Sequence, residues 1–347
     1  MIREPVVCPC CPLHCDDVDP TELMNGKTGC DVADSRIASM MLGGSANDPA
    51  NLATCRQWLR DANRVIVTGH VIDLETSRAV SEFAAATGAD LHVASSNPAM
   101  LAEFAREGAF LTTLGELVSR DVSLLVIGDV ASSWPRIETR IEKIRTIQRW
   151  RDDDELPAKL ATLRGAVSNR FLPQTRISEE VAAVTEIIKA STYFVVLVAP
   201  LSEDSATSPI IWSTILGMIR ELNSVTRAAI LSFDQSVTVR SVMASRFDPK
   251  PYRLPLDENA IQIHFSPFGE THKRRGGKSI VIGIGDKVFI NNQLCLPASV
   301  PGLHHSGIVF RGDGSVTLPL QNCLERTDSL NSLPTPAEQL RRLFASD

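Results

Sequence analysis

Residues 64–94, RVIVTGHVIDLETSRAVSEFAAATGADLHVA, decide the predicted fold. The first six are rich in β-branched side chains and predict a short buried strand, and residues 74–87 carry apolar side chains at helical spacing before Gly88. Residues 90–94 predict the next strand. A strand, a helix and a strand in succession indicate parallel strands that are covered by a helix.

The same alternation continues toward the C-terminus. Asn97 and Pro98 are typical of the start of a helix over residues 98–106, with Asn97 as its N-cap, and residues 122–127 predict a third strand of the same unit. A second α/β unit is expected to follow. Its predicted helices span 178–190, 209–222 and 237–245, its predicted strands span 193–199 and 228–233, and a further helix at 137–150 precedes it.

The C-terminal part is less regular and richer in strands. Asp313 and Gly314 form a hairpin-type turn signal within residues 307–320. Thr335 and Glu338 have the spacing of a capping box at the start of a last helix. The other expected strands of this part lie at 261–265, 280–284 and 288–296.

The predicted fold class is therefore α/β, with repeated Rossmann-like parallel-sheet units and a small Cys-rich N-terminal segment. Four segments are expected along the chain. They are the Cys-rich segment at 1–50, a first α/β unit at 51–150, a second at 151–258, and a strand-rich segment with the terminal helix at 259–347.

Composition and charge exclude several classes of protein. The 347 residues are 44% hydrophobic and 22% charged, which is typical of a globular chain, and the net charge of −6 gives no footprint for nucleic acid or an anionic membrane. The N-terminus lacks the apolar region of a signal peptide, and the longest apolar runs are too short to span a bilayer. We therefore expect a cytoplasmic protein whose eight cysteines are not a disulfide framework.

Five of the eight cysteines lie within the first 30 residues. Cys8, Cys11, Cys15 and Cys30 have the spacing C-x2-C-x3-C-x14-C, in which three close thiols and one distant thiol suit a [4Fe-4S] cluster. Thiolate ligands also suit zinc, so the metal stays open between the two. Cys10 is surplus, because it is too close to both neighbours to share the site.

One histidine and three further cysteines remain outside this predicted metal site. His14 is either a further ligand or a loop histidine without a metal role. Cys55, Cys295 and Cys323 are isolated in the sequence, and we expect them to be small buried hydrophobic residues.

Several stretches carry a resemblance to a known family. They are CPLHCDD at 11–17, TLGEL at 113–117, ILGMIRELN at 215–223 and LPASVPGLHHSGIVFRGDG at 296–314. The chain resembles the B subunit of formylmethanofuran dehydrogenase, which belongs to the molybdopterin-dependent oxidoreductases. The resemblance implies a shortened form of that protein's fold, with the missing parts around 150–175 and 235–260.

One departure from this family concerns the metal. After the second strand the family has a cysteine followed by a histidine, and the cysteine thiolate binds molybdenum or tungsten. Here residues 95–98 are Ser-Ser-Asn-Pro, and no cysteine occurs between Cys55 and Cys295. A serine hydroxyl is a poor substitute for a soft thiolate, so Ser95 and Ser96 argue against a molybdopterin or tungstopterin cofactor. The catalytic metal ligand is missing, and we assign no catalytic residue to this chain.

The chain is most similar, on this ground, to the redox-inactive B subunit of the bacterial formyltransferase/hydrolase complex. That resemblance implies amidohydrolase-like, formyltransferase-like and C subunits as partners. It implies a supporting role in formyl transfer from tetrahydromethanopterin to a methanofuran-type carrier and in formate release, within formaldehyde oxidation. Two alternatives stay open: a redox-active formylmethanofuran dehydrogenase component with an iron-sulfur cluster and a pterin-bound metal, and an iron-sulfur electron-transfer module.

Two remaining motifs are weaker. His304 and His305 resemble a ligand pair, but adjacent strand residues point to opposite faces, so a loop or interface role is expected. The basic run at 273–275 is expected to be a solvated loop, with steering of an acidic carrier tail as the alternative.

Overall fold

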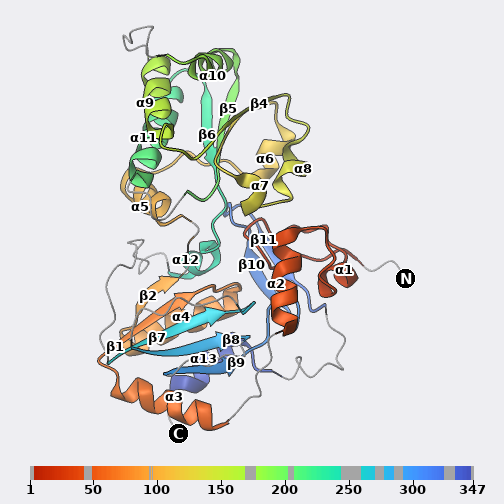
Figure 1. Ribbon diagram of the computed structural model, residues 1–347, viewed down its shortest axis with the longest axis vertical. Helices are drawn as coiled ribbons and strands as arrows, with labels where there is room; N and C mark the ends of the chain where they lie inside the picture. The colour runs from red at the N-terminus through yellow and green to blue at the C-terminus, as the bar shows by residue number, and fades with distance from the viewer. Residues whose placement is uncertain are drawn as a thin grey trace. The chain divides into compact units, whose positions relative to one another are not determined.

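Two parallel β-sheets form the framework of the chain (Figure 1). The structure is a computed structural model, and it describes residues 4–42, 49–93, 95, 97–168, 177–201, 207–243, 259–269, 277–284, 292–323 and 333–344. Contacts divide the chain into two compact units, one made of Met1–Ser95 with Gln235–Asp347 and one made of Ser96–Asp234. A bilayer crossing needs about 20 apolar residues, and none of the helices within the described ranges offers such a stretch.

The first unit contains a five-stranded sheet in the order β2-β1-β7-β8-β9, in which every pair is parallel (Figure 1). Its strands are β1 (Arg64–Gly69), β2 (Asp90–Val93), β7 (Ala260–Ser266), β8 (Lys278–Gly283) and β9 (Gln293–Pro297). A separate antiparallel hairpin joins β10 (Gly307–Phe310) to β11 (Thr317–Leu320). The helices of this unit are α1 (Pro20–Met24), α2 (Asp31–Leu42), α3 (Pro49–Asp61), α4 (Leu74–Thr87), α12 (Val237–Met243) and α13 (Pro336–Phe344).

Alternate side chains of this sheet build the core of the first unit. One face of the sheet is fully buried and carries Val67 of β1, Ile263 of β7 and Ile280 of β8. It packs against Phe83 of α4 and Leu340 of α13. The face follows from the period of two in a strand, and the helices supply the complementary apolar stripe. Burial of such side chains contributes about 25 cal/mol per Å² of apolar surface removed from water.

The second unit contains a four-stranded parallel sheet in the order β4-β3-β5-β6. Its strands are β3 (Ser123–Ile127), β4 (Thr146–Trp150), β5 (Tyr193–Val198) and β6 (Arg227–Leu231). All six residues of the central strand β5 are buried, as expected for a parallel strand covered on both faces. The helices are α5 (Pro98–Glu107), α6 (Leu114–Ser119), α7 (Val130–Ser133), α8 (Ile137–Ile141), α9 (Leu156–Val167), α10 (Glu179–Ala190) and α11 (Ser208–Leu222).

The predicted α/β class with repeated Rossmann-like parallel units is confirmed. Several local signals are confirmed with it. Gly88 ends α4 in the left-handed conformation at φ 71°, and the Thr335–Glu338 capping box forms, with Glu338 N–H donating to Thr335 Oγ1 and Thr335 N–H donating to Glu338 Oε2. The strands around the Asp313–Gly314 turn pair as a hairpin.

Two predictions about residues 64–150 are wrong. The helix expected over 137–150 ends at Ile141, and Thr146–Trp150 instead form the edge strand β4, which pairs with β3. Hydrogen bonding to β3 stabilises residues 146–150 as a strand more than their helical spacing stabilises a helix. The sequence also predicts that the strand at 122–127 shares a sheet with β1 and β2, whereas β3 pairs with β4 and β5.

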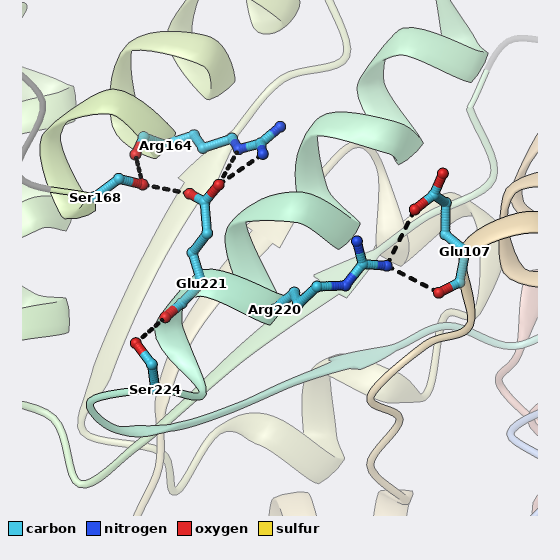
Figure 2. Close-up of polar contacts among 6 residues, drawn as sticks. All are labelled: Glu107, Arg164, Ser168, Arg220, Glu221 and Ser224. Carbon is cyan, nitrogen blue, oxygen red and sulfur yellow. Dashed lines mark hydrogen bonds and ion pairs between the residues drawn. The ribbon is translucent and has the colours of Figure 1, made fainter.

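A glycine of α11 lies beneath Arg164 of α9, and Figure 2 shows the hydrogen bonds of that arginine to Glu221. A Cβ atom on Gly217 would lie 2.5 Å from Cζ of Arg164, so the guanidinium group lies directly over the backbone of α11. Arg164 donates from Nε and Nη2 to Oε1 of Glu221, at 3.1 and 2.6 Å, and Ser168 Oγ donates to Oε2 of the same carboxylate. This packing explains a glycine inside a helix, where alanine is intrinsically better.

Replacing Gly217 by alanine should therefore have an effect that depends on Arg164. In an Arg164→Ala background, Gly217→Ala should stabilise the chain by about 1 kcal/mol, the difference in helix propensity. With Arg164 present, the new methyl group displaces the guanidinium group from Glu221, so the gain should vanish or change sign. Urea unfolding of the four chains of this cycle measures the difference. An equal gain in both backgrounds would contradict the packing described above.

Candidate functional site

The N-terminal cysteines lie on a tight loop that closes on itself. Val6 and Val18 pair as an antiparallel bridge, Cys8 N–H donates to the carbonyl of Cys15 at 2.8 Å, and His14 N–H donates to the carbonyl of Cys11 at 3.0 Å. His14 takes a positive φ of 44°, which the tight turn requires of it. The loop therefore presents several cysteines from a few consecutive residues.

The four predicted ligands all lie in the interior of the first unit. Cys8, Cys11, Cys15 and Cys30 are all buried free thiols, and Cys30 directly precedes α2. Burial raises the pKa of the Cys11 thiol well above its usual range, and interaction with the thiols of Cys8, Cys15 and Cys30 raises it further. The remote cysteine is thus within electrostatic reach of the loop.

Their arrangement is not that of a single-ion site. Within the described ranges, no three His, Cys, Asp or Glu side chains are placed to hold one metal ion. Thiols suit both a [4Fe-4S] cluster and zinc as donors, and both assignments stay predictions.

Two neighbours of these ligands are held by the loop itself. Cys10 is completely buried and its side chain is hydrogen-bonded to that of Cys8. Nδ1 of His14 donates to the carbonyl of Cys8 at 3.1 Å, and burial lowers the pKa of His14 to about 4, so the ring is neutral. His14 accordingly has the role of a loop histidine in this structure.

The isolated cysteines differ from one another. Cys55 and Cys295 are buried, as predicted. Cys323 is only half-buried, and its prediction is wrong in part. Its thiol donates to the carbonyl of Gly302 at 3.2 Å, and burial together with the thiol of Cys8 raises its pKa to about 11. The sequence gives no sign that Cys323 lies near the N-terminal loop. The fold brings it close enough for the Cys8 thiol to affect its pKa.

The same unit offers the carboxyl ends of β1 and β7, the place where open parallel sheets usually bind ligands. Here three side chains of the protein pack against one another. Phe268, just beyond β7, is 1% exposed, with the ring of His70 at 6.3 Å and the guanidinium carbon of Arg36 at 5.2 Å from its ring centroid. His70 N–H donates to the carbonyl of Phe265 at 2.8 Å, so the two strands stay paired to their ends.

His304 and His305 lie in a loop, as predicted, and do not point at a common partner. Nδ1 of His304 accepts from Val300 N–H at 2.9 Å, so its proton sits on the buried Nε2. Nδ1 of His305 is 2.8 Å from Oγ of Ser299. Asp73 lies near His305, and its burial raises the pKa of that carboxyl group.

The structure describes one of the two serines that stand where the family has its metal-binding cysteine. Ser95 lies two residues beyond β2, while Ser96 and the basic run at 273–275 lie outside the described residues. Asn97 occupies the N-cap position of α5, but the prediction that its side chain caps the helix is wrong. Its Oδ1 accepts from Nε1 of Trp212 at 3.1 Å, and its Nδ2 donates to the carbonyl of Ala199 at 3.4 Å.

The buried His304 ring should make the fold sensitive to acid. Burial lowers its pKa from 6.5 to about 4, and the charge of His305 adds to this shift. The pKa of His304 is lower in the folded state than in the unfolded state, so the unfolded chain takes up a proton first as the pH falls. The free energy of unfolding therefore keeps its full value above pH 6.5 and decreases as the pH falls toward 4. The loss should be on the order of 3 kcal/mol. Denaturant unfolding across this pH range measures it.

His304→Gln is the matched variant, because the amide oxygen still accepts from Val300 N–H and does not titrate. Its free energy of unfolding should fall less steeply than that of the unchanged chain below pH 6.5, and the two should be similar at pH 8. Parallel pH profiles for the two proteins would rule out His304 as the source.

The comparisons with known proteins bear on the fold. No family model matches the sequence, and no curated protein matches it. Among solved structures, the chain is similar to one chain of the formyltransferase/hydrolase complex from Methylorubrum extorquens in complex with methylofuran. The TM-score is 0.65 at 17% sequence identity, and the alignment covers 87% of this chain and 96% of the other. At this identity the chain shares the fold of that protein.

Proposed function

We propose that the chain is a non-catalytic component of a formyltransferase/hydrolase-type complex, in the position of the B subunit. The shared fold extends over nearly the whole of the neighbour's chain, so the similarity is not confined to one Rossmann-like unit. That neighbour is a part of a complex solved with methylofuran. The stretches that resemble the B subunit of formylmethanofuran dehydrogenase point to the same position.

One observation carries the non-catalytic part of the proposal. No cysteine occurs anywhere between Cys55 and Cys295, and the residue that follows the end of β2 in the position of the family's metal ligand is Ser95 or Ser96. Soft thiolates hold molybdenum and tungsten, and a serine hydroxyl near neutral pH does not replace them well. The chain therefore lacks the side chain on which the family's redox chemistry depends.

Packing at the carboxyl edge of the five-stranded sheet supports the same interpretation. Just beyond β7, the ring of Phe268 packs against His70 and Arg36. Gly69 packs so closely on the backbone of Phe265 that a Cβ atom would lie 2.2 Å from its carbonyl oxygen.

In this role the chain supports chemistry that its partners perform. We propose amidohydrolase-like, formyltransferase-like and C subunits as those partners, in the cytoplasm. The formyl group then passes from tetrahydromethanopterin to a methanofuran-type carrier and is released as formate. The chain contributes shape and contact surface to the assembly.

Metal analysis of the purified complex, together with a formyl-transfer assay, tests the proposal. Molybdenum and tungsten should be far below one atom per chain while formyl transfer is intact. Ser95→Ala should leave complex assembly, metal content and formyl transfer unchanged, because the hydroxyl group binds no metal. One molybdenum or tungsten atom per chain that is lost in Ser95→Ala would overturn it, and so would a stable complex without formyl transfer in the unchanged protein.

The buried thiols favour a second candidate, an iron-sulfur electron-transfer module. Four buried thiols, three in one loop and one directly before α2, are a donor set that such modules use. Iron with a visible absorbance shoulder that bleaches on reduction, in a chain that forms no complex with formyl-transferring partners, would favour this candidate over the first.

A further inference from the structure

The four-stranded sheet of the second unit continues beyond β6 in residues 110–112, which we call the edge segment. Leu111 pairs with Ile230 of β6 as a parallel bridge. The carbonyl of Phe110 accepts from Ile230 N–H at 2.8 Å, and Thr112 N–H donates to the Ile230 carbonyl at 3.0 Å. The side chains of Phe110 and Leu111 are 50% and 54% exposed, so two adjacent large apolar groups are open to solvent.

The backbone groups of Leu111 face away from β6. Successive residues of a strand direct their N–H and C=O groups to opposite edges, and Phe110 and Thr112 supply the groups that reach Ile230. Among the described residues, neither the N–H nor the C=O of Leu111 makes a hydrogen bond. The edge segment therefore offers one donor and one acceptor, both on the same residue, at the open side of the sheet.

Contacts at both ends hold the edge segment in place. Oγ1 of Thr112 accepts from the hydroxyl of Tyr193 at 2.6 Å and donates to Oε2 of Glu116 at 2.9 Å. Before the segment, the carbonyl of Glu107 accepts from Nη2 of Arg220 at 2.8 Å (Figure 2). A segment that is already ordered loses little conformational entropy when it binds a partner.

The charged side chains that flank the edge segment are paired with one another. Glu116 is paired with Arg227 at 2.7 Å, and Glu107 is paired with Arg220 at 3.1 Å. These opposite charges cancel, so they add no repulsion at an apolar edge. A second copy of this chain, which carries the same net charge of −6, can approach such an edge more easily than a charged one.

The opposite edge of the same sheet differs in this respect. Its edge strand β4 carries Arg149, which is exposed and lies 2.6 Å from a carboxylate oxygen of Glu138. Charged side chains on an edge strand discourage pairing with another chain. The edge segment has the sequence Phe-Leu-Thr and carries no such charge, which favours an interface at this edge of the sheet.

We propose that the edge segment pairs with the same segment of a second copy of this chain, antiparallel and about a twofold axis at Leu111. In an antiparallel ladder, two residues that form a hydrogen-bonded pair exchange both of their N–H···O=C bonds. The open donor and acceptor of Leu111 match those of its counterpart in this way. The pairing also removes apolar surface from water. A contact over a few residues is small, so we expect a weak dimer.

Charge substitutions at Leu111 test this pairing. Leu111→Lys and Leu111→Glu each place like charges opposite each other across the axis, so each variant alone should dimerise about a hundredfold more weakly than the unchanged chain. An equimolar mixture of the two variants should form dimers again, because opposite charges then face each other. Ile210→Lys is the matched control, since Ile210 is an apolar side chain of α11 that is 58% exposed in the same unit.

Sedimentation velocity of the full chains over a wide range of concentrations gives the dissociation constant of the dimer. Circular dichroism and urea unfolding check that every variant folds. Ile210→Lys should dimerise like the unchanged chain, and an equal loss in this control would contradict a specific role of Leu111. The proposal also fails if the mixture of Leu111→Lys and Leu111→Glu does not associate.

Two further outcomes would overturn the proposal. One is an unchanged chain that stays monomeric at every concentration. The other is a monomeric chain that binds a different protein through this edge and loses that binding in Leu111→Lys, which would assign the edge to another partner. The dimer is measured without partner subunits, so the result leaves the proposed function to its own test.

Discussion

The pairing of β1 with β7 is the contact on which the rest of the first unit depends. Six successive residues of β1 lie in parallel register with β7, from Arg64 opposite Ala260 to Gly69 opposite Phe265. Gly69 takes a φ of 93°, and only the absence of a side chain allows the two backbones to approach so closely at the end of the strands. This one pairing unites two stretches of sequence into one sheet and defines its carboxyl edge.

The candidate site is built from several distant parts of the first unit. The cysteine loop is folded by its own backbone hydrogen bonds, but its surroundings come from distant parts of the chain: Phe268 beyond β7, Gly302 and Cys323 near the hairpin, and Arg311 opposite Asp16. Gly312 N–H also donates to the carbonyl of Pro12 at 2.7 Å. The N-terminal segment is therefore an integral part of the first unit, and its thiols are buried because the C-terminal part covers them.

Local signals in the sequence predict local structure well. The capping box of Thr335 and the glycine end of α4 each rest on hydrogen bonds within a few residues, and so does the turn at Asp313. The pairing of strands is harder to predict, because the sequence of a strand does not indicate which other strand it pairs with. That is why the sequence predicts the wrong sheet for β3 and a helix in place of β4: pairing energy comes from a strand that is remote in sequence.

The same division applies to the site. The four cysteines could be found because their spacing is compact and chemically specific. Arg36 and Cys323 could not, because an arginine inside a helix and a single late cysteine carry no signal of their own. Only the folded chain shows that Arg36 lowers the pKa of Cys8 and that Cys8 raises the pKa of Cys323.

The second unit lies in the sequence between the two parts of the first unit. This order affects how the chain can fold while it is being synthesised. Thr68 of β1 and Ile263 of β7 are 195 positions apart, with the whole of Ser96–Asp234 between them. At about 5–20 residues per second, the ribosome needs roughly 10–40 s to deliver the partner strand. Throughout that interval the second unit can complete itself, while β1 keeps an open edge and the thiols of the N-terminal loop stay accessible. The early part of the first unit is therefore completed only after the second unit has been synthesised.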